Sequence, residues 1–212
     1  MQRSLKVKYC GLKTLDDVES AAEAQVDAIG LVFVENSPRY ISPEDAIDLA
    51  AAAKHSGLLV VALFANHQAA SVACVIQTIE PDVLQFHGNE TVEFCEQFEH
   101  RYWKAIPMLE TQNYQAYMAQ YPKAEAFLLD AFGGQQAGGS GRSFKWFQFP
   151  EKLLPKLILA GGIHAENVTA AIAATGAQFI DTSSGIESTP GVKSKTKMLA
   201  LVARVRTIDQ PN

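Results

Sequence analysis

Short runs rich in β-branched and aromatic residues alternate with amphipathic segments along this 212-residue chain, and the alternation predicts a single-domain (β/α)8 (TIM) barrel. Eight such units leave about 26 residues for each, slightly fewer than usual for this fold. An open doubly wound sheet is the competing architecture, but it requires a phosphate fingerprint after its first strand, and Gly11 stands there alone. We therefore expect residues 1–212 to form one barrel domain.

The predicted strands are short and are separated by single helical segments, which favours parallel pairing and right-handed crossovers. They cover residues 5–9, 28–34, 58–64, 83–87, 102–108, 126–130, 156–162 and 178–183.

The helical segments carry recognisable start and stop signals. Thr14 and Ser42 precede two of them and can act as N-caps, and Pro43 suits a first helical turn. Gly57 and Gly176 occupy positions that favour a left-handed C-terminal cap. These signals predict helices at 15–24, 43–57, 67–79 and 164–176.

The composition excludes several classes of function. A net charge of −5 disfavours nucleic acid and anionic membranes as partners. The three cysteines, Cys10, Cys74 and Cys95, cannot all pair and lack metal-ligand spacing, so no disulfide framework or metal site is expected. Cys74 and Cys95 fall in helical segments and are predicted to be core residues. No apolar run is long enough for a signal peptide or a membrane span, so we expect a cytoplasmic protein.

Reactive side chains follow or end several predicted strands. They are Cys10 after the first, Arg39 after the second, His87 at the end of the fourth, Asp130 at the end of the sixth and Asp181 near the end of the eighth. The active site of such a barrel lies at the carboxyl ends of its strands. We therefore expect these side chains to share one rim.

Three glycine-rich segments add a second signal at the same rim. They are GGQQAGGSGR at 133–142, AGGI at 160–163 and TSSGIESTPG at 182–191, after strands six, seven and eight. Glycine lets backbone amides approach an anion, and the loops after strands seven and eight commonly bind phosphate in these barrels. The pattern predicts a phosphate site.

A thiol and a carboxylic acid across a barrel mouth, with no metal cluster or nucleotide loop, indicate proton transfer without a cofactor, as in an isomerase or a lyase. Lys8 lies two residues before Cys10, on the same side of the strand. Its charge favours a thiolate at Cys10, or it pairs with a carboxylate inside the barrel such as Asp181. The sequence leaves both possibilities open.

The motifs closely resemble those of the phosphoribosylanthranilate isomerases, a family of tryptophan biosynthesis. They are KYCGLKT, GLVFVENSPRYIS, LQFHG, LLDAFGGQQAGGSGRSFKW, LAGGIHAENV and FIDTSSGIESTPGVK, and the similarity runs from about Val7 to Met198. Lys145 and Ser194 stand where the family commonly has aspartate. The resemblance implies the third step of that pathway from chorismate: a cofactor-free Amadori rearrangement of N-(5-phosphoribosyl)anthranilate to 1-(2-carboxyphenylamino)-1-deoxyribulose 5-phosphate.

The resemblance also implies residue roles. Asp130 matches the general acid that opens the ribose ring, and Cys10 matches the general base that removes the proton from C2. Arg39 would bind the anthranilate carboxylate, and His87 would line the pocket. The remaining expected substrate-binding residues, mainly around the phosphate, are Gly139, Gly161, Gly162, Asp181, Ser183, Ser184 and Gly185.

Two alternatives remain open on the residues alone. A related barrel enzyme is one, such as a phosphoribosyl isomerase of histidine biosynthesis, indole-glycerol-phosphate synthase or thiamine-phosphate synthase. The histidine enzymes are expected to carry aspartate in place of Cys10 and to show visible half-barrel repeats. Indole-glycerol-phosphate synthase is expected to have a longer N-terminal extension. A catalytically silent phosphate-binding module is the other. We expect a small phosphosugar as the only partner, and a monomer, because no apolar stripe marks the outer helices.

Overall fold

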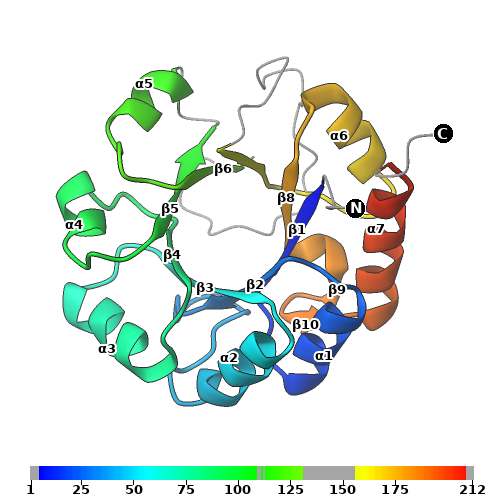
Figure 1. Cartoon of the computed structure of the whole chain (residues 1–212), viewed down its shortest axis with the longest axis horizontal. Helices are drawn as coiled ribbons and strands as arrows, with labels where there is room; N and C mark the ends of the chain where they lie inside the picture. The colour runs from blue at the N-terminus through cyan, green and yellow to red at the C-terminus, as the bar shows by residue number, and fades with distance from the viewer. Residues whose placement is uncertain (1–4, 109–110, 112, 131–155, 209–212) are drawn as a thin grey trace.

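A closed barrel of eight parallel strands forms the centre of the molecule (Figure 1). The computed structural model describes residues 5–108, 111, 113–130 and 156–208. The strands pair in chain order, and β8 closes the barrel against β1. They are β1 Lys6–Cys10, β2 Ala28–Val32, β3 Leu59–Phe64, β4 Val83–Phe86, β5 Tyr102–Pro107, β6 Ala126–Asp130, β7 Leu157–Leu159 and β8 Phe179–Thr182. The predicted (β/α)8 barrel is confirmed.

Helices surround the barrel on the outside (Figure 1). Those described are α1 Leu15–Glu23, α2 Ala46–His55, α3 Ala69–Ile79, α4 Val92–Glu96, α5 Tyr114–Ala119, α6 Val168–Thr175 and α7 Lys195–Ile208. After β8 the chain forms a 3-10 turn, η2 Ser184–Ile186, and a hairpin of β9 Glu187–Thr189 and β10 Val192–Lys193. That hairpin was not predicted.

The predicted capping residues act largely as expected. Thr14 caps α1 through a capping box with Asp17, and Gly176 ends α6 with φ +64°. The regular part of α2 begins at Ala46, later than predicted. Ser42 still accepts the first hydrogen bonds, from the Asp45 amide through its hydroxyl and from the Ala46 amide through its carbonyl. The Ser42-Pro43 signal therefore marks the start of a turn that leads into the helix.

Strand β7 is shorter than the predicted 156–162. Gly161 and Gly162 have φ values of +82° and +65°, which no strand residue adopts. The chain therefore leaves the sheet before the glycines, which lie in the loop at the barrel mouth.

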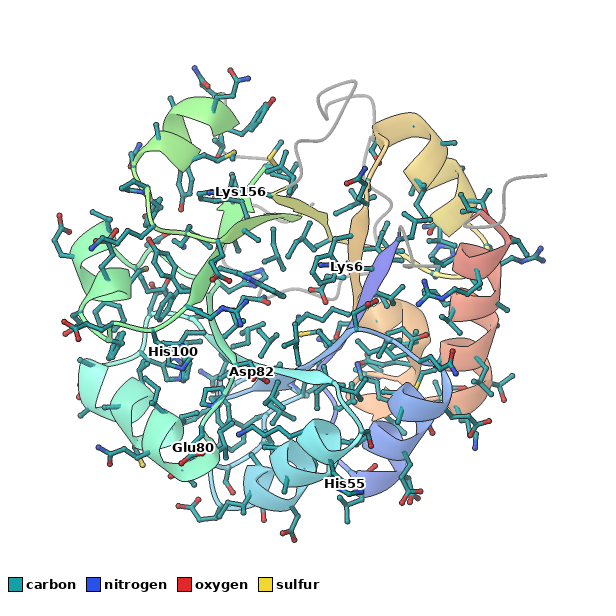
Figure 2. All side chains as sticks on the ribbon, viewed as in Figure 1. Lys6, His55, Glu80, Asp82, His100 and Lys156 are labelled. Atoms are coloured by element: carbon teal, nitrogen blue, oxygen red, sulfur yellow. The ribbon has the colours of Figure 1, made fainter. Side chains whose placement is uncertain are left out.

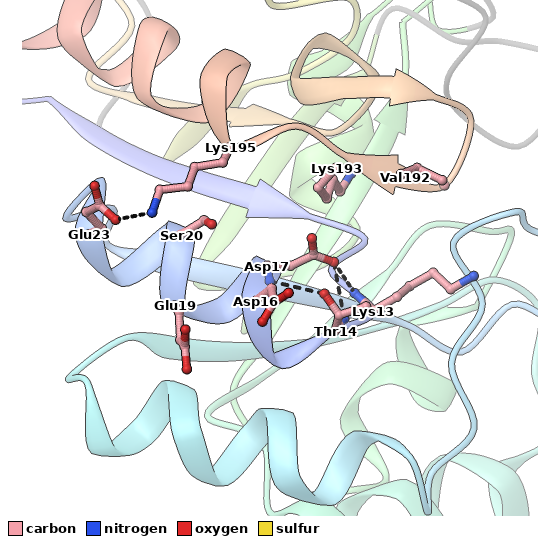
Figure 3. Close-up of a pocket in the computed structure, with 11 residues that line it drawn as sticks. Lys13, Thr14, Asp16, Asp17, Glu19, Ser20, Glu23, Val192, Lys193 and Lys195 are labelled. Atoms are coloured by element: carbon pink, nitrogen blue, oxygen red, sulfur yellow. Dashed lines mark hydrogen bonds and ion pairs between the residues drawn. The ribbon is translucent and has the colours of Figure 1, made fainter.

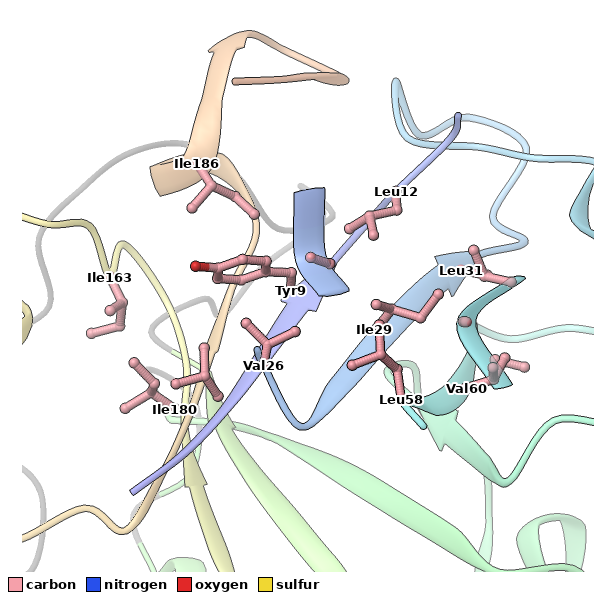
Figure 4. Packing of buried hydrophobic residues seen from close by; sticks show 14 of the residues in the cluster. Tyr9, Leu12, Val26, Ile29, Leu31, Leu58, Val60, Ile163, Ile180 and Ile186 are labelled. Carbon is pink, nitrogen blue, oxygen red and sulfur yellow. The ribbon is translucent and has the colours of Figure 1, made fainter. Parts of the chain in front are cut away.

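Alternate strand residues divide between two hydrophobic layers. One set fills the barrel interior: Ala28, Val61, Val83, Trp103, Ala105, Ala126, Leu128, Ile158 and Ala160. The other set packs against the helices and includes Tyr9, Ile29 and Val60 (Figure 4). Side chains occupy both the inside of the ring and the space between ring and helices (Figure 2). The barrel is thus a packed core and not an open pore.

Burial also tests the cysteine predictions. Cys95 on α4 is buried, as predicted, but the prediction for Cys74 was wrong, since it lies on the exposed side of α3. Among the described residues, no helix combines the length and apolar character that a membrane span requires.

Candidate active site

The carboxyl rim of the barrel gathers the reactive residues that the sequence singled out. Cys10 is the last residue of β1 and Asp130 the last of β6, where its backbone pairs with Pro107 of β5. Arg39 follows β2 and His87 follows β4. Because all eight strands are parallel, these positions share one end of the barrel.

The thiol of Cys10 lies in a closed environment at the mouth. Its side chain clusters with Val32 and Leu63, and the residue is only 5% exposed. The Ser183 hydroxyl donates a hydrogen bond of 2.9 Å to the Cys10 carbonyl, which ties the end of β1 to the segment after β8. The sequence placed Ser183 near the substrate, and the structure places it directly against the backbone of Cys10.

A buried ion pair lies one pleat below the thiol. Lys8 donates to Asp181 Oδ1 at 2.9 Å, from β1 to the adjacent strand β8. Burial lowers the pKa of Lys8, but Asp181 and Cys10 raise it, and the net direction is upward. Of the two possibilities for Lys8, pairing with Asp181 is confirmed. Asp181, predicted to bind substrate, therefore has a partner inside the barrel.

Burial raises the pKa of the Cys10 thiol, while the charges of Lys8 and Lys193 lower it and Asp181 raises it. The net direction is upward because water is excluded from the sulfur. The two ammonium groups are the features that favour the thiolate.

The Arg39 side chain lies across Gly11, the residue after Cys10. A Cβ on Gly11 would lie 2.6 Å from Arg39 Cδ, and Gly11 has φ +77°, so only glycine suits this position. Beyond the glycine, Arg39 donates to both carboxylate oxygens of Glu187, from Nε at 2.7 Å and from Nη2 at 2.8 Å. This bidentate geometry holds the guanidinium plane in one orientation.

A second cation shares the same carboxylate. Lys193 donates to Glu187 at 2.8 Å and to the Ser183 carbonyl at 3.1 Å. Burial raises the pKa of Glu187, but Arg39 and Lys193 lower it, and the net direction is downward. Two cations around one carboxylate leave one net positive charge beside Cys10. We call Arg39, Glu187 and Lys193 the rim cluster.

The hairpin after β8 brings the rim cluster together. A Cβ on Gly191 would lie 2.2 Å from the Pro38 carbonyl oxygen, so the hairpin turn packs directly on the loop after β2. This contact sets Glu187 at the start of β9 and Lys193 at the end of β10 against Arg39.

His87 is half-buried at the end of β4. Its amide donates to the Phe64 carbonyl, and its Nδ1 lies 3.2 Å from Gln85 Nε2. A Gln85 amide that donates to Nδ1 leaves the ring proton on Nε2. The position agrees with a residue that lines the pocket.

Two of the predicted phosphate loops, those after β7 and β8, pack against each other. A Cβ on Gly185 would lie 1.9 Å from the Ile163 carbonyl oxygen, and the Thr182 hydroxyl donates to that oxygen at 2.6 Å. The loops that carry Gly162 and Ser184 are therefore adjacent at the rim. Gly139, with the rest of 133–142, lies outside the described residues.

A groove of about 680 Å³ lies between α1 and the hairpin (Figure 3), and Lys193 of the rim cluster is one of the residues that line it. Acidic and basic side chains line it, and Lys195 pairs with Glu23 at 2.6 Å with both groups more than half exposed. Such pairs belong to a solvated surface. The groove contains no residue that the sequence predicted to act in catalysis. In the described part of the chain, no three metal-binding side chains gather anywhere.

Sequence reasoning missed Glu187 and Lys193 of the rim cluster, and also Gly30, the neighbour of Cys10 on β2. Glu187 and Lys193 belong to the motif D-x-S-S-G-x-E-x-x-P-G-x-K, so the sequence shows their spacing. It does not show which side chains they contact. Glu187 meets Arg39 across 148 positions of sequence. Only the closed barrel and its hairpin show that contact.

Known proteins resemble this chain over almost its entire length. The family model described as "N-(5'phosphoribosyl)anthranilate (PRA) isomerase" matches residues 7–204. An N-(5'-phosphoribosyl)anthranilate isomerase of Acidithiobacillus ferrooxidans is 42% identical over 95% of this chain and 98% of its own length. The Xanthomonas euvesicatoria protein of that name is 39% identical over 99% and 98%.

Solved structures agree in fold. Phosphoribosyl anthranilate isomerase from Thermotoga maritima superposes with a TM-score of 0.81 at 28% identity, covering 96% of this chain and 99% of its own. A structure of such an isomerase in complex with reduced 1-(o-carboxyphenylamino)-1-deoxyribulose 5-phosphate gives a TM-score of 0.78 at 27% identity, with the same coverage.

Proposed function

This chain belongs to the N-(5'-phosphoribosyl)anthranilate isomerase family, and we propose that it rearranges N-(5-phosphoribosyl)anthranilate to 1-(2-carboxyphenylamino)-1-deoxyribulose 5-phosphate in tryptophan biosynthesis. The observation that carries the proposal is the position of Cys10 and Asp130. They end two strands at one rim of a closed barrel, although they are far apart in the sequence. The reaction requires an acid and a base on a substrate held between them.

In the proposed mechanism the two groups act in turn. Asp130 gives a proton to the ring oxygen of the ribose, the bond from that oxygen to C1 breaks, and the anthranilate nitrogen forms a protonated Schiff base. The Cys10 thiolate then takes the proton from C2, and the electrons of that bond neutralise the iminium as an enolamine. Protonation at C1 and loss of the O2 proton give the ketone. The steps need no cofactor or metal.

The rim cluster supports the proposed role of Arg39 in binding the anthranilate carboxylate. Its net positive charge attracts an anion, and Glu187 fixes the orientation of the guanidinium. We propose that Gly139, Gly161, Gly162, Ser183, Ser184 and Gly185 bind the phosphate at the far end of the substrate. The adjacent position of the loops after β7 and β8 supports this.

Single-turnover isomerisation, followed by loss of substrate fluorescence, tests the proposal. We expect fast turnover by the wild type, and rates lower by at least about 100-fold for Cys10→Ser and for Asp130→Asn, because each removes one proton-transfer group. Tyr40→Phe is a matched control on the loop beside Arg39 and should keep the wild-type rate. A wild type that binds the substrate without turning it over would instead make the chain a phosphate-binding module.

Assembly and location complete the proposal. We propose a single-domain monomer that acts in the cytoplasm, where its three free cysteines would stay reduced. One related structure at 26% identity describes monomers generated from a dimeric Thermotoga maritima enzyme. Light scattering that gives one chain per particle, together with one unfolding transition, supports the proposal; a dimer contradicts it.

A further inference from the structure

The space beside Gly30 brings a lysine and the thiol together. A Cβ added to Gly30 would lie 2.8 Å from Cys10 Sγ and 3.0 Å from Lys8 Nζ. Lys8 and Cys10 are two residues apart on β1 and face the same side of the sheet, while Gly30 is the direct neighbour of Cys10 on β2. The ammonium and the sulfur therefore share the volume that any other residue at position 30 would fill.

Asp181 fixes the ammonium in that volume. Its carboxylate lies 2.9 Å from Lys8 Nζ, and the Lys8 side chain has no exposed surface. A lysine ammonium carries three donors. One is directed to Asp181, and Cys10 Sγ, which borders the same volume beside Gly30, is a second partner. An ammonium in so dry a site needs both partners.

We propose that Lys8 is a positioning residue for the isomerase reaction: anchored by Asp181, its ammonium stabilises the Cys10 thiolate in the space that Gly30 leaves open. This inference rests on the proposed function, because it concerns the group assigned there as the base. It adds three residues to the description of the base, none of which transfers a proton to the substrate.

The charged groups around the sulfur define what each substitution changes. Lys8 faces it from β1, Asp181 from β8 and Lys193 from β10. The cations favour the thiolate, whereas Asp181 acts in two ways. It holds Lys8 in place, but its own negative charge disfavours a thiolate nearby. Loss of the Lys8 cation and loss of the Asp181 anion should therefore shift the pKa of the Cys10 thiol in opposite directions.

The test is a titration of the Cys10 thiol by its ultraviolet absorbance as a thiolate. Each protein is compared with the same protein carrying Cys10→Ser, which removes the contributions of tyrosine, Cys74 and Cys95. We expect Lys8→Met to reduce the thiolate at a fixed pH by at least about tenfold, equivalent to one pKa unit. Asp181→Asn is expected to increase it. A merely structural ion pair would not produce opposite shifts.

Two further variants complete the design. Lys8→Arg keeps the positive charge and should restore much of the thiolate that Lys8→Met loses. Gly30→Ala leaves every charge in place but fills the shared volume, so it should also reduce the thiolate. If Lys8→Met does not fold, Asp181→Asn and Gly30→Ala still give opposite predictions. The inference would be overturned if Asp181→Asn changed the amount of thiolate in the same direction as Gly30→Ala and Lys8→Met, or if no variant changed it.

The titration is independent of turnover, so two failures can be told apart. Opposite shifts in a protein that does not isomerise phosphoribosylanthranilate would leave the effect of Lys8 on the Cys10 thiolate standing but reject the proposed function, and with it a role for Lys8 in that reaction. If the wild type is active but no variant changes the thiolate fraction of Cys10, the proposed function stands and the inference about Lys8 is rejected. If the proposed function and the inference are both correct, the rising limb of the pH–rate profile should follow the pKa of the Cys10 thiol in every variant.

Discussion

Two fully buried lysines, Lys8 and Lys104, lie on opposite sides of the barrel wall. Lys8 on β1 points into the barrel, toward Asp181 and the thiol. Lys104 on β5 points outward, between neighbours that face the interior, and pairs with Glu90 at 3.2 Å. It also donates to the carbonyls of Phe86 and Gly88. The inner lysine has a reactive group as its second partner, and the outer one has backbone.

The two environments shift the pKa values of the two lysines in opposite directions. Burial lowers the pKa of Lys104, and Glu90 only partly offsets this, so the net direction is downward. For Lys8 the partners outweigh burial, and its pKa is raised. Glu90 also accepts from the amides of Asn66 and Gly88, so the outer network joins the loops after β3 and β4. The difference is one of place: the inner ion pair lies beside the thiol at the barrel mouth, whereas the outer ion pair ties two loops together.

The largest expected effect comes from the outer pair. Lys104→Met leaves the Glu90 carboxylate buried without its cation, which typically costs about 3–5 kcal/mol of unfolding free energy. Turnover per folded molecule should stay close to wild type, since Lys104 lies outside the barrel. Urea denaturation and single-turnover kinetics measure the two quantities.

The matched control is the pair of Lys123 and Glu96, which are 2.8 Å apart and whose lysine is open to water. Lys123→Met should leave the unfolding free energy close to wild type, because exposed pairs contribute little. A large loss of turnover per folded Lys104→Met molecule would break the comparison, since the outer lysine would then act on the site.

The next effect, on substrate binding, is expected from the rim cluster. Glu187→Gln keeps the shape of the side chain but weakens its hold on Arg39 and Lys193. The guanidinium loses its fixed orientation, so KM should rise about tenfold, which is about 1.4 kcal/mol, with a smaller change in kcat. Steady-state kinetics provide the split. A fall in kcat with unchanged KM would place Glu187 in the chemical step instead.

Local signals in the sequence were sufficient for much of this structure. Thr14 caps α1 and Gly176 ends α6 as predicted, because a cap depends on residues within one turn of it. Cys10 and Asp130 were identified because alternating strands and helices fix which strand ends share a rim. Lys8 and Asp181 could be paired as one of two possibilities, since both were expected inside the barrel.

Other features depend on contacts that no local pattern encodes. The interaction of Glu187 with Arg39 arises from the packing of Gly191 on Pro38, a contact between two loops. The close approach of Lys8 and Cys10 depends on the missing side chain at Gly30. Glycine inside a strand also occurs at bulges and tight bends, so its presence alone does not indicate a shared volume. Long-range packing decides such cases, and a single sequence does not.

Acid pH gives a smaller effect that sharpens the comparison. The net pKa of Glu187 is lowered in the folded protein, so its stabilising contribution is complete above the unfolded value of about 4.3 and is lost as pH falls through the folded value. Glutamine does not titrate. The stability difference between wild type and Glu187→Gln, measured by urea denaturation, should therefore shrink below about pH 4. A constant difference would mean that Glu187 stabilises the fold through shape alone.

The smallest expected effect is the coupling between the two lysines. β1 and β5 lie four strands apart in either direction around the barrel, and the contacts described for Lys8 and Lys104 have no residue in common. The unfolding free energies of Lys8→Met and Lys104→Met should therefore add to within about 0.5 kcal/mol in the double variant. Coupling well above that value would mean that the inner and outer layers respond together. The assignment of one lysine to chemistry and the other to stability would then have to be abandoned.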